Sequence, residues 1–233
     1  TYNVDWGVPS DGDRYLGMED YIDRYMHNVI EHVCERTGQE KITLVGYCMG
    51  GSMSTIYTAL HPERVKNFIL MAAPVDWSSK ENLLALWADE RYFDVDRMIE
   101  VYGNAPAEWL QSSFALLKPV SNLVEKYLSF YENMDNERFL EDFFAMETWL
   151  NDNIPVAGEI YREYVKYLYQ ENRLVKGTLP VGRHVIDLKN ITCPILNIMA
   201  TRDDLVPCAQ SKPFNGLVGS KDKEILELNA GHI

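Results

Sequence analysis

The segment that most constrains the fold is the hexapeptide GYCMGG at residues 46–51, which stands between two regular segments. Residues 41–47 are apolar and β-branched, as in a buried strand, whereas residues 50–60 show the apolar spacing of a helix. Residues 65–73 predict a second buried strand. A strand, a helix and a strand within about 30 residues form a βαβ unit, and such units build parallel sheets. The sequence therefore predicts an α/β fold around this hexapeptide.

Cys48 lies in the middle of the hexapeptide, where a glycine-flanked nucleophile would occupy a sharp turn between strand and helix. In such a turn the side chain projects above the carboxyl end of the strand, and the helix N-terminus beneath it favours thiolate over thiol. The backbone N–H of Met49 would supply half of an oxyanion hole. The alternatives are a small buried cysteine without a catalytic role and Ser52, a weaker candidate nucleophile one turn into the helix.

A thiol nucleophile needs a base and an acid that orients the base, in the chain order nucleophile, acid, base. Asp203 follows a buried strand predicted at residues 193–200, and His232 follows a short strand predicted at residues 224–228. Cys48, Asp203 and His232 occur in the required order and in the required context. They are therefore the predicted catalytic residues of an α/β-hydrolase fold with a mostly parallel sheet.

Other residues compete for these roles. Asp204 adjoins Asp203, and Asp76 also follows the end of a predicted strand. His27 and His32 lie on a helix predicted at residues 18–36, and we expect both to be solvated. The remaining histidines and cysteines have structural roles in this interpretation: His61, His184, Cys34, Cys193 and Cys208.

The composition excludes several classes of function. The formal net charge of -13 argues against a general nucleic-acid or anionic-membrane surface, which requires excess Lys and Arg. No apolar run approaches the roughly 20 residues of a membrane span. The four cysteines form neither a CxxC pair nor a metal-like cluster with histidine, so we expect no metal, no cofactor and free thiols in the cytoplasm.

The chain is interpreted as a single domain, residues 1–233, truncated at both ends: it lacks an initiator Met and stops just after His232. Residues 2–6 predict the end of a strand. Residues 77–189 show helical stretches and many aromatic residues, but no clear buried strand. A crossover needs only about a dozen residues, so this interval predicts a large helical cap over the sheet. The alternative is a second helical domain without a role at the site.

At this point the sequence resembles the catalytic subunit of polyhydroxyalkanoate (PHA) synthases, and most closely the two-subunit (class III) type. The resemblance covers essentially the whole chain. It is carried by several short segments in combination: Asp5-Trp6-Gly7, residues 46–51, residues 73–76, Lys118-Pro119, residues 146–149, residues 191–194, Asp203 with Val206-Pro207, and residues 231–233.

The resemblance implies an acyltransferase that polymerises (R)-3-hydroxyacyl-coenzyme A through a covalent thioester on Cys48 and releases coenzyme A (CoA), which is substrate and not cofactor. His232 would be the general base, while Asp203 would orient His232 or help activate the incoming hydroxyl. The resemblance further implies the growing polyester chain as a partner, a homodimer, a second synthase subunit, and a place at the surface of cytoplasmic polymer granules.

Two other functions remain open at the level of sequence. One is a cysteine-nucleophile hydrolase, such as an intracellular PHA depolymerase, a thioesterase or a dienelactone-hydrolase-like enzyme. The other is a non-enzymatic scaffold with a vestigial site. The second oxyanion donor of this fold comes from a loop near the N-terminus that the sequence lacks. We therefore expect this 233-residue polypeptide by itself to be inactive or unstable.

Overall fold

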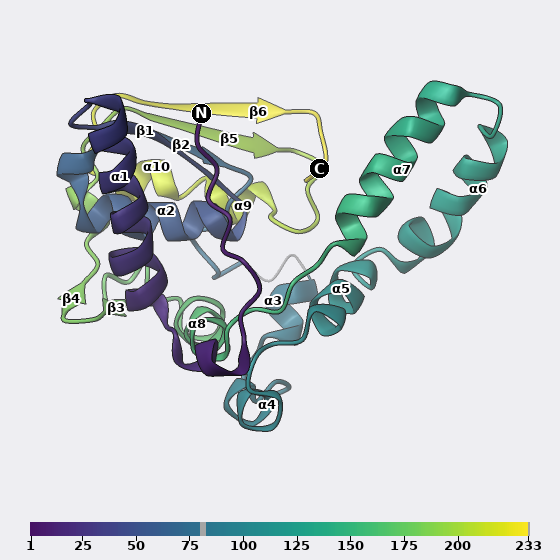
Figure 1. Cartoon of the computed structure of the whole chain (residues 1–233), viewed down its shortest axis with the longest axis horizontal. Helices are drawn as coiled ribbons and strands as arrows, with labels where there is room; N and C mark the ends of the chain where they lie inside the picture. Colours follow the sequence, from purple (N-terminus) through teal and green to yellow (C-terminus); the bar gives the residue numbers. More distant parts are fainter. Residues whose placement is uncertain (80–82, 233) are drawn as a thin grey trace.

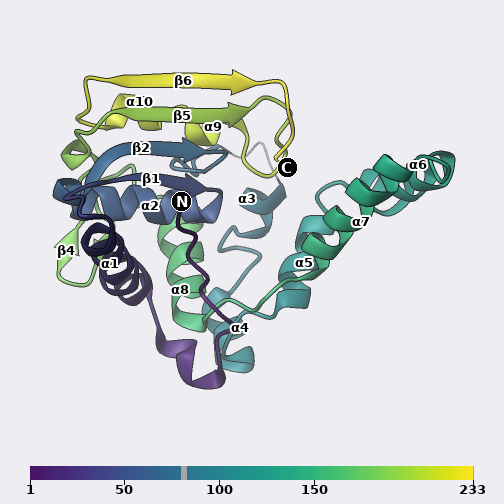
Figure 2. The same ribbon diagram turned by 45° about the horizontal axis from the view of Figure 1, so that its top comes forward.

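The computed structural model describes residues 1–79 and 83–232, which contain one four-stranded parallel sheet (Figure 1). The strands lie in the order β1-β2-β5-β6, so the chain leaves the sheet after β2 and returns beside it (Figure 2). The predicted α/β class with a mostly parallel sheet is thereby confirmed. The strands are β1 (Ile42–Tyr47), β2 (Val65–Met71), β5 (Ile195–Ala200) and β6 (Lys223–Leu228).

Helices cover one face of this sheet: α2 packs on β1 and β2, α9 on β5, and α10 on β6. Phe68 and Leu70 of β2 point into this layer and are fully buried. The ring of Phe68 meets Phe214 of α10 edge to face, with centroids 5.9 Å apart. The helices of the layer and of the chain around it are η1 (Asp11–Tyr15), η2 (Glu19–Met26), α1 (His27–Thr37), α2 (Met49–Leu60), η3 (Pro62–Arg64), α9 (Cys208–Ser211) and α10 (Phe214–Leu217).

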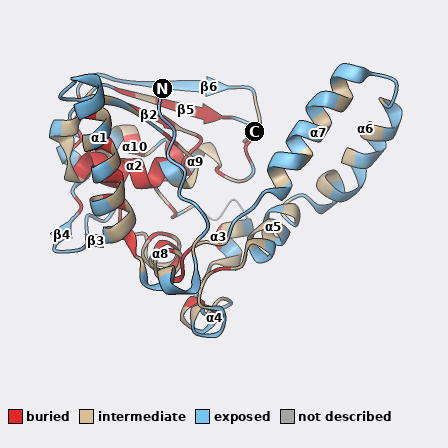
Figure 3. Ribbon diagram, viewed as in Figure 1, coloured by how far each residue is buried: buried red, intermediate tan, exposed pale blue. Residues whose placement is uncertain are grey.

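The opposite face of the sheet carries exposed apolar side chains. Val45 of β1 is 54% exposed, and every residue of β6 is exposed (Figure 3). Because parallel sheets normally bury both faces, the described residues leave this face short of partners. The prediction that residues 2–6 end a strand is wrong for the described structure. Trp6 instead packs against the ring of Tyr21 in η2, with centroids 5.3 Å apart.

The interval 77–189 is mainly helical and divides into two parts. Residues 107–151, called the arm from here on, project away from the sheet (Figures 1 and 2). Residues 157–188 return to the rest of the molecule, called the body from here on (residues 1–79, 83–106 and 152–232), where Leu168 and Leu179 are fully buried. The elements of the interval are α3 (Leu83–Trp87), α4 (Val95–Tyr102), α5 (Ala107–Ala115), η4 (Ser121–Glu125), α6 (Lys126–Glu132), α7 (Glu137–Asn151), α8 (Gly158–Glu163), η5 (Tyr164–Gln170), the antiparallel pair β3 (Pro180–Val181) and β4 (His184–Val185), and η6 (Leu188–Asn190).

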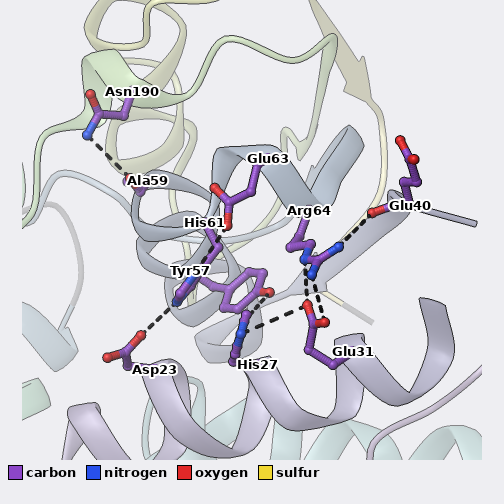
Figure 4. Close-up of polar contacts among 10 residues, drawn as sticks. All are labelled: Asp23, His27, Glu31, Glu40, Tyr57, Ala59, His61, Glu63, Arg64 and Asn190. Atoms are coloured by element: carbon purple, nitrogen blue, oxygen red, sulfur yellow. Dashed lines mark hydrogen bonds and ion pairs between the residues drawn. The ribbon is translucent and has the colours of Figure 1, made fainter. Parts of the chain in front are cut away.

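Two histidines join η2 and α1 to the C-terminal end of α2 (Figure 4). The rings of His27 and His61 stack with centroids 4.2 Å apart. His61 hydrogen-bonds Asp23 at 2.7 Å, and His27 hydrogen-bonds the Tyr57 hydroxyl at 3.2 Å. The prediction that His27 is solvated is therefore wrong. Helical periodicity placed His27 on its helix but could not reveal a partner that only the packing of α2 brings close.

Candidate active site

Cys48 occupies the turn between β1 and α2 with φ 52° and ψ −128°. A positive φ is uncommon for a residue with a side chain and costs on the order of 1–3 kcal/mol, so it persists only where the surroundings enforce it. Here the Cys48 N–H donates to the carbonyl of Met71 at the end of β2, at 3.1 Å. The strained turn places the thiol at the carboxyl end of the sheet, as the hexapeptide predicted.

The glycines of the hexapeptide differ in what they permit. A Cβ on Gly46 would stand 2.6 Å from the Cα of Gly51, and a Cβ on Gly51 would stand 2.3 Å from the Cβ of Ala73. Both distances are shorter than real Cβ contacts, so these two glycines let α2 pack closely against β1 and the segment after β2. Gly50 has open space around it. The close packing therefore depends on Gly46 and Gly51.

The structure brings Cys48, Asp203 and His232 together. His232 Nδ1 lies 2.6 Å from Asp203 Oδ2, and the His232 ring also interacts with Cys48. The Asp203 side chain is fully buried. Its Oδ1 accepts from the backbone N–H groups of Leu205 at 2.9 Å and Val206 at 2.7 Å. With both carboxylate oxygens engaged in this way, Asp203 is placed to orient His232.

Burial by itself would lower the pKa of His232, but hydrogen bonds to Asp203 and Cys48, reinforced by the charges of both partners, raise that pKa to about 9. A more basic imidazole holds a proton more firmly than free histidine does. The arrangement therefore places a basic imidazole where it can accept the thiol proton of Cys48.

The backbone N–H of Met49 is available for an oxyanion. Met49 is the first residue of α2, and the first N–H groups of a helix have no carbonyl partner within it. The positive end of the dipole of this 12-residue helix adds to the attraction for negative charge. The position of Met49 fits the predicted role as one oxyanion donor.

The competing side chains are occupied elsewhere. Asp76 accepts from Ser78 N–H and from the amide of Asn172, and Asp204 forms an ion pair with Lys118, which lies between α5 and η4. Ser52 is fully buried and donates to the carbonyl of Pro74 at 2.6 Å. None of these contacts involves His232.

All four cysteines are free thiols. Cys34 is buried, while burial raises the pKa of the Cys193 and Cys208 thiols and so keeps them protonated. Among the cysteines, Cys48 is the one that interacts with a histidine in the described structure.

A cavity of about 600 Å³ adjoins Cys48. Cys48 and Met49 line it together with Leu205 and Val206, which follow Asp203. Among its described lining residues, Asp152 is the one charged side chain, so the cavity suits an apolar acyl group better than phosphates. The rest of the wall is rich in aromatic rings: Trp87, Phe93, Trp109, Phe114, Tyr161, Tyr164 and Tyr169.

Tyr47 is a further site residue that the sequence did not single out. Its hydroxyl donates to the backbone carbonyl of His232 at 2.7 Å, and the two rings lie 5.0 Å apart. The only signal in the sequence was its place directly before Cys48, since that position varies freely in the glycine-flanked pattern.

The sequence model of the alpha/beta hydrolase fold matches residues 5–233. The chain belongs to the α/β-hydrolase family. Among solved structures, the monoacylglycerol lipase of Paleococcus ferrophilus matches 94% of this α/β-hydrolase chain and 68% of its own, with a TM-score of 0.56 and 15% identity. At that identity the likeness concerns the fold alone.

Curated relatives of this α/β-hydrolase chain are much closer in sequence. This chain is 44% identical to the poly(3-hydroxyalkanoate) polymerase subunit PhaC of Haloferax mediterranei over 233 residues. The alignment covers all of this chain and 47% of that protein. It is 39% identical to the subunit of the same name from Allochromatium vinosum, over all of this chain and 65% of that protein. The chain thus spans about half to two thirds of these relatives, and the predicted resemblance to PHA synthases is confirmed.

Within residues 1–79 and 83–232, no helix combines the length and the apolar character that crossing a bilayer demands.

Proposed function

We propose that this chain is the catalytic part of a PHA synthase, which polymerises (R)-3-hydroxyacyl-CoA through an acyl group carried on Cys48. The observation that carries the proposal is a cysteine on a strained elbow, next to His232 and its partner Asp203, beside an aromatic cavity. The similarity to PhaC subunits over the whole chain supports the same conclusion.

In the first half-reaction, His232 takes the proton of Cys48 and the thiolate attacks the thioester carbonyl of the substrate. The Met49 N–H faces the oxyanion that forms. The carbonyl carbon gains a bond to Cys48 Sγ and loses its bond to the CoA sulfur, which leaves with the proton from His232. One thioester replaces another, so little free energy is lost and the acyl group stays activated.

In the second half-reaction, His232 takes the proton of a 3-hydroxyl group from another hydroxyacyl unit. The resulting alkoxide attacks the Cys48 thioester, forms an ester, and releases Cys48 as a thiolate that His232 can reprotonate. Water competes with this hydroxyl. The aromatic wall of the cavity favours transfer to the alcohol because it excludes water from the acyl group.

The proposal needs no resident cofactor, and CoA enters only as the leaving group. It also includes a homodimer, a second synthase subunit, the growing polyester as partner, and a place at the surface of cytoplasmic polymer granules. Exposed apolar side chains on the arm support contact with other surfaces: Val120, Leu123, Val124, Leu128 and Tyr131 are each more than half exposed.

The test uses the intact protein with (R)-3-hydroxybutyryl-CoA. Released CoA is measured as free thiol, and the acyl product is separated into polymer and free 3-hydroxybutyrate. We expect polymer to account for most of the CoA released, and Cys48→Ala to release none. Free acid in equal amount to CoA would instead establish the alternative function, a cysteine-nucleophile hydrolase on the same fold.

A further inference from the structure

Tyr47 and Cys48 are neighbours in the chain, and both contact His232. Tyr47 ends β1, and its hydroxyl donates to the His232 carbonyl at 2.7 Å across a sequence separation of 185 residues. The two rings are tilted by 34° with centroids 5.0 Å apart. The residue directly before the nucleophile is therefore also a main-chain anchor of the base.

His232 needs such an anchor because it lies in a loop beyond β6. Among the described residues, the last main-chain hydrogen bond before it joins the Arg202 N–H to the carbonyl of Ala230 at 3.0 Å. Within residues 1–79 and 83–232, the Tyr47 hydroxyl supplies the one hydrogen bond to the main chain of His232. Asp203 holds the ring through Nδ1, and Tyr47 holds the backbone. His232 is thus held both at its ring and at its backbone.

The Tyr47 hydroxyl can keep this role over a wide pH range. Burial, with smaller contributions from the charges of Cys48 and Asp203, raises the pKa of Tyr47 to about 12. The phenol stays protonated and remains a donor at any pH where His232 changes its charge.

We propose that Tyr47 is a positioning residue, which holds His232 at the distance and angle needed for proton transfer with Cys48. The proposal rests on the proposed function only in taking Cys48 as the nucleophile. Proton transfer requires a heavy-atom separation of about 2.6–3.2 Å, and a displacement of about 1 Å can cost up to about a hundredfold in rate. Because Tyr47 belongs to the same rigid turn as Cys48, it links the base directly to the nucleophile.

The decisive variant is Tyr47→Phe, which keeps the ring beside His232 and removes only the hydroxyl. In the intact protein we measure the rate of Cys48 alkylation by iodoacetamide against pH, with kcat and KM for CoA release. We expect alkylation near neutral pH to slow by about three- to tenfold, with the acidic limb of its profile moved to higher pH. The value of kcat should fall while KM changes little. Tyr131→Phe, on an exposed arm residue, is the matched control.

A double-variant comparison separates positioning from a general structural role. Tyr47→Phe should slow alkylation when His232 is present and have no further effect in a His232→Gln background. An equal effect in both backgrounds, or no effect in either, would overturn the proposal. Alkylation needs no acyl substrate, so a wild-type protein that hydrolyses instead of polymerising would overturn the proposed function and leave this test intact.

Discussion

The body and the arm of this molecule bury their apolar side chains to very different extents. In the body, the sheet and its helices enclose a continuous core that includes Ile56, Tyr57 and Phe68, all fully buried. In the arm, α5, η4, α6 and α7 contain no buried residue (Figure 3). The arm helices mainly pack on one another, through rings such as Phe130 and Phe143 with centroids 4.7 Å apart.

The two regions meet near the candidate active site. A cavity of about 700 Å³ is lined on one side by Met146 and Trp149 of α7, and on the other by Tyr47 and His232. The strained turn at Cys48 needs a rigid setting, which the body supplies. The arm borders the same site with an apolar surface and little burial. The rigid body thus holds the candidate catalytic residues, whereas the arm offers an exposed apolar surface for contacts.

The largest effect should come from Cys48→Ala. We expect loss of CoA release and of fast alkylation by iodoacetamide, because no other thiol interacts with a histidine among the described residues. Cys208→Ala is the matched control and should leave both unchanged, since burial raises the pKa of that thiol. Unchanged CoA release by Cys48→Ala would exclude Cys48 as the nucleophile.

The next effect tests the difference in burial directly. Phe68→Ala in the body should lower the free energy of unfolding by about 3–5 kcal/mol, because Phe68 is fully buried. Phe144→Ala in the arm should cost less than about 1 kcal/mol, because Phe144 is 55% exposed. Urea unfolding measures both. Equal costs would show that the arm is buried by a partner under the conditions of the experiment.

The third effect concerns pH and only the body. The pKa of His232 is raised from 6.5 to about 9, so its protonated form contributes stability that is complete below pH 6.5 and is lost as the pH rises through 9. We expect a loss of about 1–2 kcal/mol, reduced by solvent screening at this partly open site. Urea unfolding between pH 6 and about 10 measures this. His232→Gln should abolish the loss, and an equal loss in that variant would assign it to other groups.

The smallest effect belongs to the arm. Lys126 and Glu147 join α6 to α7 at 2.8 Å, with partly exposed side chains. Glu147→Gln should cost no more than about 1 kcal/mol, because water screens such pairs. We expect the change to appear as faster amide hydrogen exchange in α6 and α7, with no change in α2 or β2. Faster exchange in α2 would show that the two regions unfold together.

Much of the body was predictable from local patterns. The strands at residues 42–47, 65–71 and 195–200 lie where apolar runs predicted them, because a strand of a parallel sheet is usually apolar on both faces. The strand at residues 223–228 lies where a short last strand was predicted. The three candidate catalytic residues followed from one hexapeptide and from the ends of later strands. The catalytic roles themselves stay predictions until the variants above are measured.

The arm was less predictable, because helical periodicity reports only that a helix has an apolar side. The helical stretches of the interval 77–189 predicted a cap over the sheet, but not which helices would return to the core and which would project. The stacked pair His27 and His61, and the contact from Tyr47 to His232, were likewise invisible. Each joins residues that are distant in the sequence, and no single-sequence pattern specifies such a pair.

The sequence by itself determined the elbow, the order of Cys48, Asp203 and His232, and the parallel sheet that presents them, because strand periodicity and glycine geometry act over a few residues. Only the tertiary structure decided that Gly51 permits the close approach of α2, that Tyr47 holds the base, and that residues 107–151 stand away from the core. These features depend on distances between remote segments, and those distances exist only once the chain has packed.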